Sequence, residues 1–184
     1  MKPRIKFCFD YGCDPFWSDN DLSVELYGIS NISANRLNFS EKTLNLINVA
    51  NCLDDIYLNP LYQMFPSFWS EKLCFYFNQL AEETYQSSCA DLGDRVELVK
   101  GYSAGITEDE NLAFFLFDPV EYCLQKGISF GDPEKFKAEV EEQEEVYRKF
   151  TEFVISGKFE KAILSGQEIL RRGKIVVNLL DKES

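Results

Sequence analysis

The sequence contains no histidine, and its 31 acidic residues outnumber its 19 basic residues. Histidine is the usual general base near neutral pH and the commonest zinc ligand. Its absence argues against triad hydrolysis, Cys-His catalysis and His-bearing metal sites. The net charge of -12 argues against binding to nucleic acid, because phosphates attract Lys and Arg. The sequence therefore favours a protein-binding domain over an enzyme.

Long apolar runs and paired cysteines are also missing. The longest wholly apolar run, residues 112–117, is far shorter than the roughly 18 residues of a membrane span. The opening residues include bases but no apolar stretch before Asp10, which is unlike a signal peptide. No two cysteines form a C-x-x-C pair, and we expect free thiols rather than a metal site or disulfides. The cysteines are Cys8, Cys13, Cys52, Cys74, Cys89 and Cys123. The sequence predicts a cytoplasmic chain without membrane segments, metal or other cofactors.

Aromatic residues are abundant, with 16 Phe and 9 Tyr. At 45% hydrophobic residues the chain is too apolar to be disordered, and its length suits one domain with a sizeable core. Aromatic side chains that do not fit a core are favoured anchors at protein interfaces. Trp17 and Trp69 lie in aromatic, turn-rich stretches and are candidate partner-binding residues.

The first part of the chain predicts a strand, a turn and a second strand. Residues 4–10 alternate in polarity, with Ile5, Phe7 and Phe9 on one side, as in a strand with one buried face. The remaining segments are a Gly-, Asp- and Asn-rich turn at 11–21, a possible short strand at 22–29 and an irregular stretch at 30–39.

Two helices and a strand should follow. Ser40 predicts the N-cap of a helix that buries Leu46, Ala50, Leu53 and Tyr57 and ends by Pro60. After an aromatic loop at 59–69, Ser70 predicts the cap of a second helix that Gly93 ends. This helix should be buried through Leu73, Phe77, Leu80 and Thr84, and residues 95–102 then alternate as a strand.

The second part of the chain predicts a central strand and two capped helices. Residues 112–117 form an apolar run that suggests a strand buried on both faces, after a polar loop at 103–111. Asp118-Pro119 and Asp132-Pro133 each predict an N-cap followed by Pro at the first helical position. The second of these helices, closed by Gly157, has the clearest buried face: Phe136, Val140, Gln143, Tyr147, Phe150 and Val154.

The C-terminal stretch is ambiguous between one interrupted helix and two short pieces at 158–172, and residues 174–180 predict a terminal strand. Together the elements predict an α+β fold, with helices packed on an antiparallel or mixed sheet. We expect a single domain over 1–184. Residues 103–184 would be an acidic, helix-rich extension ending in that strand.

Negative charge is concentrated in residues 108–155, which hold 13 acids and 5 bases. On the helix after Pro133, Glu141, Glu145 and Glu152 share the face opposite Tyr147 and Phe150. One interpretation is a solvated face that favours solubility, and the other is a docking surface for a basic partner. The candidate partner-binding glutamates are Glu139, Glu141, Glu142, Glu144, Glu145 and Glu152.

Motifs for catalysis or metal binding are nearly absent. There is no G-x-S-x-G, P-loop or G-x-G-x-x-G motif. The aspartates around the first turn and at Asp54 and Asp55 match no EF-hand spacing, and turn capping explains them more simply. A Cys8 nucleophile beside Lys6, or a two-carboxylate glycosidase, are the remaining catalytic alternatives.

Two stretches resemble a widespread group of small uncharacterised bacterial proteins found in toxin-immunity neighbourhoods. The first is KFCFDYGCDPFWSDND at 6–21, and the second begins PSFWSEKLCFYFNQLAEETY at 66 and runs through the Leu92-Gly93-Asp94 stop to Leu98. The resemblance covers roughly residues 1–100. Phe68 stands where the group has proline, Cys74 and Phe75 replace polar residues, and 103–184 has no counterpart.

The resemblance implies an immunity or antitoxin-type protein, in interbacterial competition, that neutralises a cognate toxin by direct contact. An acidic inhibitor suits a basic nuclease toxin, whose substrate groove is positive. No functional residues transfer from the group. The alternatives are a generic acidic adaptor domain and an enzyme of unrecognised type, and the oligomeric state stays open.

Overall fold

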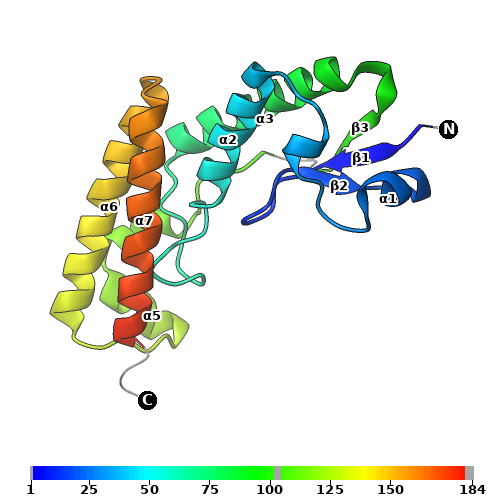
Figure 1. Ribbon diagram of the computed structural model, residues 1–184. Coiled ribbons are helices and arrows are strands. Elements are labelled where there is room, and N and C mark those ends of the chain that lie inside the picture. Colours follow the sequence, from blue (N-terminus) through cyan, green and yellow to red (C-terminus); the bar gives the residue numbers. More distant parts are fainter. Residues whose placement is uncertain (1, 102–104, 181–184) are drawn as a thin grey trace. The chain divides into compact units, whose positions relative to one another are not determined.

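The computed structural model describes residues 2–101 and 105–180 (Figure 1). Its contacts divide the chain into two compact units. The first is Met1–Asp55 with Cys74–Ile106, and the second is Ile56–Leu73 with Thr107–Ser184. Each unit is therefore assembled from two separate stretches of sequence. The α+β class is confirmed, whereas the prediction that residues 1–184 form one domain stays a prediction.

The first unit is built on a three-stranded mixed sheet in the order β2-β1-β3. Strand β1 (Arg4–Phe7) pairs antiparallel with β2 (Phe16–Ser18) and parallel with β3 (Glu97–Lys100). Five helical segments accompany the sheet: α1 (Asp21–Tyr27), η1 (Ala34–Arg36), α2 (Glu41–Asp54), α3 (Glu71–Leu92) and η2 (Gly93–Arg95).

The core of the first unit forms on one face of β1, as the alternation predicted. Ile5 and Phe7 are fully buried, and the Phe7 and Phe16 rings meet edge to face with centroids 5.6 Å apart. The other buried members are Ile32, Ala34, Leu37, Ile47, Leu92 and Val96.

Helix boundaries in the first unit follow from their caps. The Ser40 hydroxyl accepts the N–H of Thr43, and Gly93 adopts φ +52°, so the predicted start of α2 and end of α3 are confirmed. The buried face of α3 is also confirmed at Leu73, Phe77, Leu80 and Thr84.

Three predictions for this unit are wrong. Most of the stretch at 22–29 belongs to α1, which ends at Tyr27, rather than to a strand, because Asn20 and Ser23 make a reciprocal capping box. The predicted turn at 11–21 contains β2. Helix α2 buries Thr43, Ile47, Ala50 and Leu53 and ends at Asp54, so its buried face begins differently from the predicted one and Tyr57 lies beyond the helix.

The second unit consists of helices. They are α4 (Leu112–Phe117), α5 (Pro119–Lys126), α6 (Pro133–Ile155) and α7 (Phe159–Leu180). Helices α6 and α7 run side by side in opposite directions (Figure 1). The Asp118 and Asp132 caps are confirmed, and so is every member of the predicted buried face of α6.

The two strands predicted in this part are helices instead. In residues 112–117 only Leu112 and Phe115 are buried, three positions apart, while Phe117 is 83% exposed. A strand buried on both faces does not leave a phenylalanine in solvent. Residues 174–180 continue α7, which passes through Gly166 without interruption. Gly166 lies with Ala162 and Ile169 on the buried face, where small residues allow close helix packing.

Candidate docking groove on the acidic helix

The acidic residues of α6 lie outside its buried stripe, with Glu141, Glu145 and Glu152 on the opposite face and Glu139 and Glu144 at its flanks. Because Tyr147 and Phe150 point into the core, the glutamates between them and the helix start are directed outward. Glu141, Glu142, Glu144 and Glu152 are exposed, and Glu139 and Glu145 are half-buried. Within its 23 residues α6 has seven acids and four bases.

Bases neutralise most of these glutamates. Arg172 of α7 donates a 2.7 Å hydrogen bond to Glu142 and lies 3.9 Å from Glu139. Arg148 lies between Glu145 and Glu152, with N–O distances of 2.8 and 2.7 Å. Four of the six candidate glutamates therefore have basic partners, and the face is less negative than the sequence suggests.

The ion pairs shift the titration of the glutamates. Hydrogen bonds from Arg148 and from Lys149, which is 3.2 Å away, lower the pKa of Glu145 to about 2. A hydrogen bond from Arg172 lowers the pKa of Glu142. The carboxylates are at least partly exposed to solvent, where ion pairs contribute only about 0–1 kcal/mol, so a partner's cations can compete for them.

Glu141 and Glu144 differ from the other four. Among the side chains that the structure describes, neither has a basic group within 4.0 Å. They are the two candidate glutamates whose charge is not offset locally.

Glu144 borders a groove of about 440 Å³ in the second unit. The base of the groove is apolar, with the rings of Phe68 and Tyr147 stacked at 5.1 Å between centroids. Tyr147 is fixed from below by the 2.7 Å hydrogen bond that its hydroxyl donates to the Ile56 carbonyl. The remaining lining residues are Ser70, Lys72, Glu108, Leu112, Ala113, Leu116, Arg148, Thr151 and Glu152.

The groove thus combines an apolar base with a charged rim. Glu108 contributes to the rim and also accepts the backbone N–H of Glu71 at 2.8 Å, at the first turn of α3. An apolar base with a polar rim is the arrangement found at the centres of protein interfaces. We name this surface, consisting of the groove with Glu141 and Glu144, the acidic groove.

Neither of the two tryptophans predicted as partner anchors is an exposed side chain. Trp69 is fully buried, and its ring contacts Tyr57 edge to face at 5.2 Å. A side chain without exposed surface cannot anchor a partner in this conformation, so Trp69 is not part of the candidate surface. Trp17 is half-buried, and its indole N–H donates to the carbonyl of Cys8, the residue that follows the neighbouring strand β1, at 2.9 Å.

The groove residues Phe68, Leu112, Ala113 and Leu116 were not identified from the sequence. They come from two stretches that are far apart in the chain, and no local pattern connects them. A helical interpretation of 112–117 would have supplied one signal, because it places apolar side chains on more than one face.

Little else among the described residues suggests chemistry. No group of three or more Cys, Asp or Glu is placed to hold a metal ion within the part that the structure describes. Burial raises the pKa of Cys123 to about 11, and burial together with the Asp55 charge does the same for Cys52. Neither thiol is therefore activated as a nucleophile. In the described ranges no helix has the length and apolar character needed to cross a membrane.

Comparisons of the chain with protein-family models, curated proteins and solved structures found no match. The resemblance to the toxin-immunity group accordingly stays a prediction.

Proposed function

We propose that this protein binds and neutralises a basic protein toxin through the acidic groove, and that it does so in the cytoplasm of a bacterial cell. The toxin would be of nuclease type, since such enzymes carry a positive substrate groove. The observation that carries the proposal is the pair Glu141 and Glu144, unneutralised among the described side chains, beside a groove with an apolar base.

In this mechanism charge controls the rate of association, and the shape of the groove controls the rate of dissociation. The net charge of -12 attracts a basic partner from a distance and raises the rate of association. Once the proteins touch, an apolar or aromatic side chain of the toxin fills the groove over Phe68 and Tyr147, and that burial slows dissociation. Basic side chains next to this anchor pair with Glu141 and Glu144.

The test uses the full chain as bait in a lysate of the producing cell. Wild type is compared with Glu141→Lys/Glu144→Lys, and captured proteins are identified by mass. The matched control is Glu25→Lys/Glu97→Lys, which changes the net charge equally at exposed glutamates of the first unit. We expect a basic protein with wild type and the control, and markedly less of it with the Glu141/Glu144 variant.

The captured protein is then expressed alone and together with each variant. Toxicity alone, with protection by wild type and the control but reduced protection by the Glu141/Glu144 variant, supports the proposal. A captured basic protein that harms no cell supports the alternative of an acidic adaptor domain. Equal capture by all three proteins contradicts the role of the acidic groove.

The groove is tested separately through Ala113→Gln, which places a larger uncharged side chain on its exposed wall. We expect this variant to speed dissociation with little change in the association rate. The Glu141/Glu144 variant should instead slow association, and more so at low salt, because exposed charges are screened over about 10 Å at 0.1 M.

A further inference from the structure

The first unit contains a cavity of about 370 Å³. The cavity lies where the residues after β1, the end of α2, the middle of α3 and the segment at 105–106 come together. Its lining residues are Cys8, Phe9, Asp54, Phe77, Asn78, Ala81, Gly105 and Ile106. Pockets of about 300–1,000 Å³ are the size that small molecules occupy in proteins.

Most of this lining is apolar. The Phe9 and Phe77 rings meet edge to face with centroids 5.2 Å apart, and Ala81 and Ile106 complete the apolar surface. Such a wall favours a hydrocarbon group over water, because burying apolar surface releases about 25 cal/mol per Å².

The Asn78 amide is occupied in holding one wall of the cavity. Its Nδ2 donates to the Ile106 carbonyl at 2.8 Å, and its Oδ1 accepts the Ile106 N–H at 2.9 Å. The neighbouring Gly105 packs against the same amide, since a Cβ there would lie 2.7 Å from Nδ2. These two hydrogen bonds fix the wall of the cavity on the segment at 105–106.

Asp54 is the one carboxylate in the lining. It is half-buried, and within the described part of the chain it has no hydrogen bond and no ion pair. Burial is the main reason that the pKa of Asp54 rises to about 6, and the charges of Asp55 and Asp10 add to it. At neutral pH Asp54 is therefore ionised in the lining of a mostly apolar cavity, and no described side chain forms an ion pair with it.

We propose that this cavity binds a small organic ammonium ion, with the cationic group on Asp54 and the hydrocarbon part against Phe9, Phe77 and Ile106. A positive charge supplies the partner that Asp54 lacks, and the apolar wall accommodates the rest of the ligand. The proposal is independent of toxin binding, because it concerns other residues in the other unit.

The probe is n-hexylamine at pH 7.5, where alkylamines are protonated, with 1-hexanol as the neutral analogue. Binding to the full chain is followed by calorimetry and by NMR shifts of the Phe9, Phe77 and Ala81 signals. We expect saturable binding of the amine at one site. The affinity should fall at least tenfold for hexanol, and at least tenfold for the amine in Asp54→Asn.

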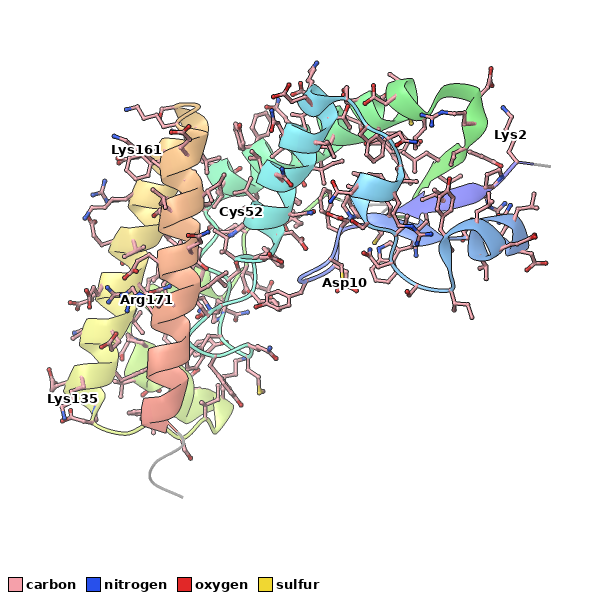
Figure 2. All side chains as sticks on the ribbon, in the orientation of Figure 1. Lys2, Asp10, Cys52, Lys135, Lys161 and Arg171 are labelled. Carbon is pink, nitrogen blue, oxygen red and sulfur yellow. The ribbon has the colours of Figure 1, made fainter. Side chains whose placement is uncertain are left out.

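Asp10→Asn is the matched control, because Asp10 is exposed at the turn after β1 (Figure 2) and does not line the cavity. It removes one nearby negative charge and should weaken amine binding less than threefold. Glu141→Lys/Glu144→Lys should leave amine binding unchanged, which separates this site from the acidic groove.

The absence of saturable amine binding overturns the proposal. It is also overturned by equal affinity for amine and hexanol, by undiminished binding in Asp54→Asn, or by a greater loss in Asp10→Asn. Circular dichroism confirms that each variant is folded. If Asp54→Asn does not fold, the proposal is tested by the affinities of the wild-type protein for hexylamine and for hexanol.

Discussion

At the residue scale, side chains of the same type differ in exposure and in pKa because their surroundings differ. Phe150 and Phe117 are both helical phenylalanines of the second unit, yet Phe150 is buried and Phe117 is exposed. Likewise, the pKa of Glu145 is lowered by bases, whereas burial raises that of Asp54.

Phe150→Ala should lower the free energy of unfolding by about 3–5 kcal/mol, because it removes a fully buried ring and leaves a cavity. Phe117→Ala is the control and should change it by less than about 0.5 kcal/mol, as is typical of surface positions. Chemical denaturation measures both. Equal effects would mean that the buried face of α6 is misassigned.

Asp54→Asn should stabilise the protein at pH 7.5. The pKa of Asp54 is about 6 in the folded chain and 3.8 in the reference state, so the folded form binds the proton more tightly. Ionisation therefore costs stability above pH 6, and this cost disappears as the pH falls below about 4. Two pKa units correspond to at most about 3 kcal/mol, and partial exposure reduces that figure.

The measurement is the difference in stability between Asp54→Asn and wild type from pH 7.5 to pH 4. Asp10 and Asp55 are present in both proteins, so the comparison changes Asp54 alone. A difference that grows as the pH falls would contradict a raised pKa.

At the element scale, the caps and periodic patterns predict helices well. Asp132 accepts the N–H groups of Glu134 and Lys135 at 3.0 and 3.3 Å and fixes the start of α6. Asp132→Ala should cost about 1 kcal/mol, whereas Asp132→Ser retains a capping oxygen and should cost a few tenths. Thermal unfolding of the two variants makes the comparison, and equal costs would argue against the cap.

Short apolar segments are where sequence reasoning fails. In residues 112–117 five of six side chains are large and apolar, and no period distinguishes a strand from a helix. The outcome depends on which side chains tertiary packing buries, here Leu112 and Phe115. The prediction of a strand at 174–180 is wrong for a related reason, because Gly173, which precedes this apolar segment, lies inside a single helix and does not end it.

The candidate sites likewise contain features that a helical period predicts and features that depend on contacts between distant segments. The outward position of Glu141 and Glu144 follows from the helical period alone. Their neutralised neighbours could not be predicted, because Arg172 reaches Glu142 from another helix, 30 residues along the chain. The cavity beside Asp54 requires the contact of four segments, which a linear pattern does not encode.

At the scale of the whole molecule, the six cysteines are expected to be free thiols. The denatured chain, prepared without reductant, should give six thiols on titration. In the folded protein the half-buried Cys13 should react before the buried Cys123, whose thiol has a raised pKa. Fewer than six thiols after denaturation would reveal a disulfide and contradict the expected reduced state.

The second unit draws on a short early stretch and a long late one, and this order affects how the chain can fold as it is synthesised. The stretch Ile56–Leu73 leaves the ribosome well before α6, yet several of its contacts are with that helix: Phe65 contacts Phe136, and the Ile56 carbonyl accepts the hydroxyl of Tyr147, 91 residues later. Before α6 emerges these contacts cannot form, although Phe65 and Phe68 can already meet Phe115 of α4. A nascent chain stalled before α6 therefore leaves part of its apolar surface uncovered and should engage chaperones more readily than the finished chain.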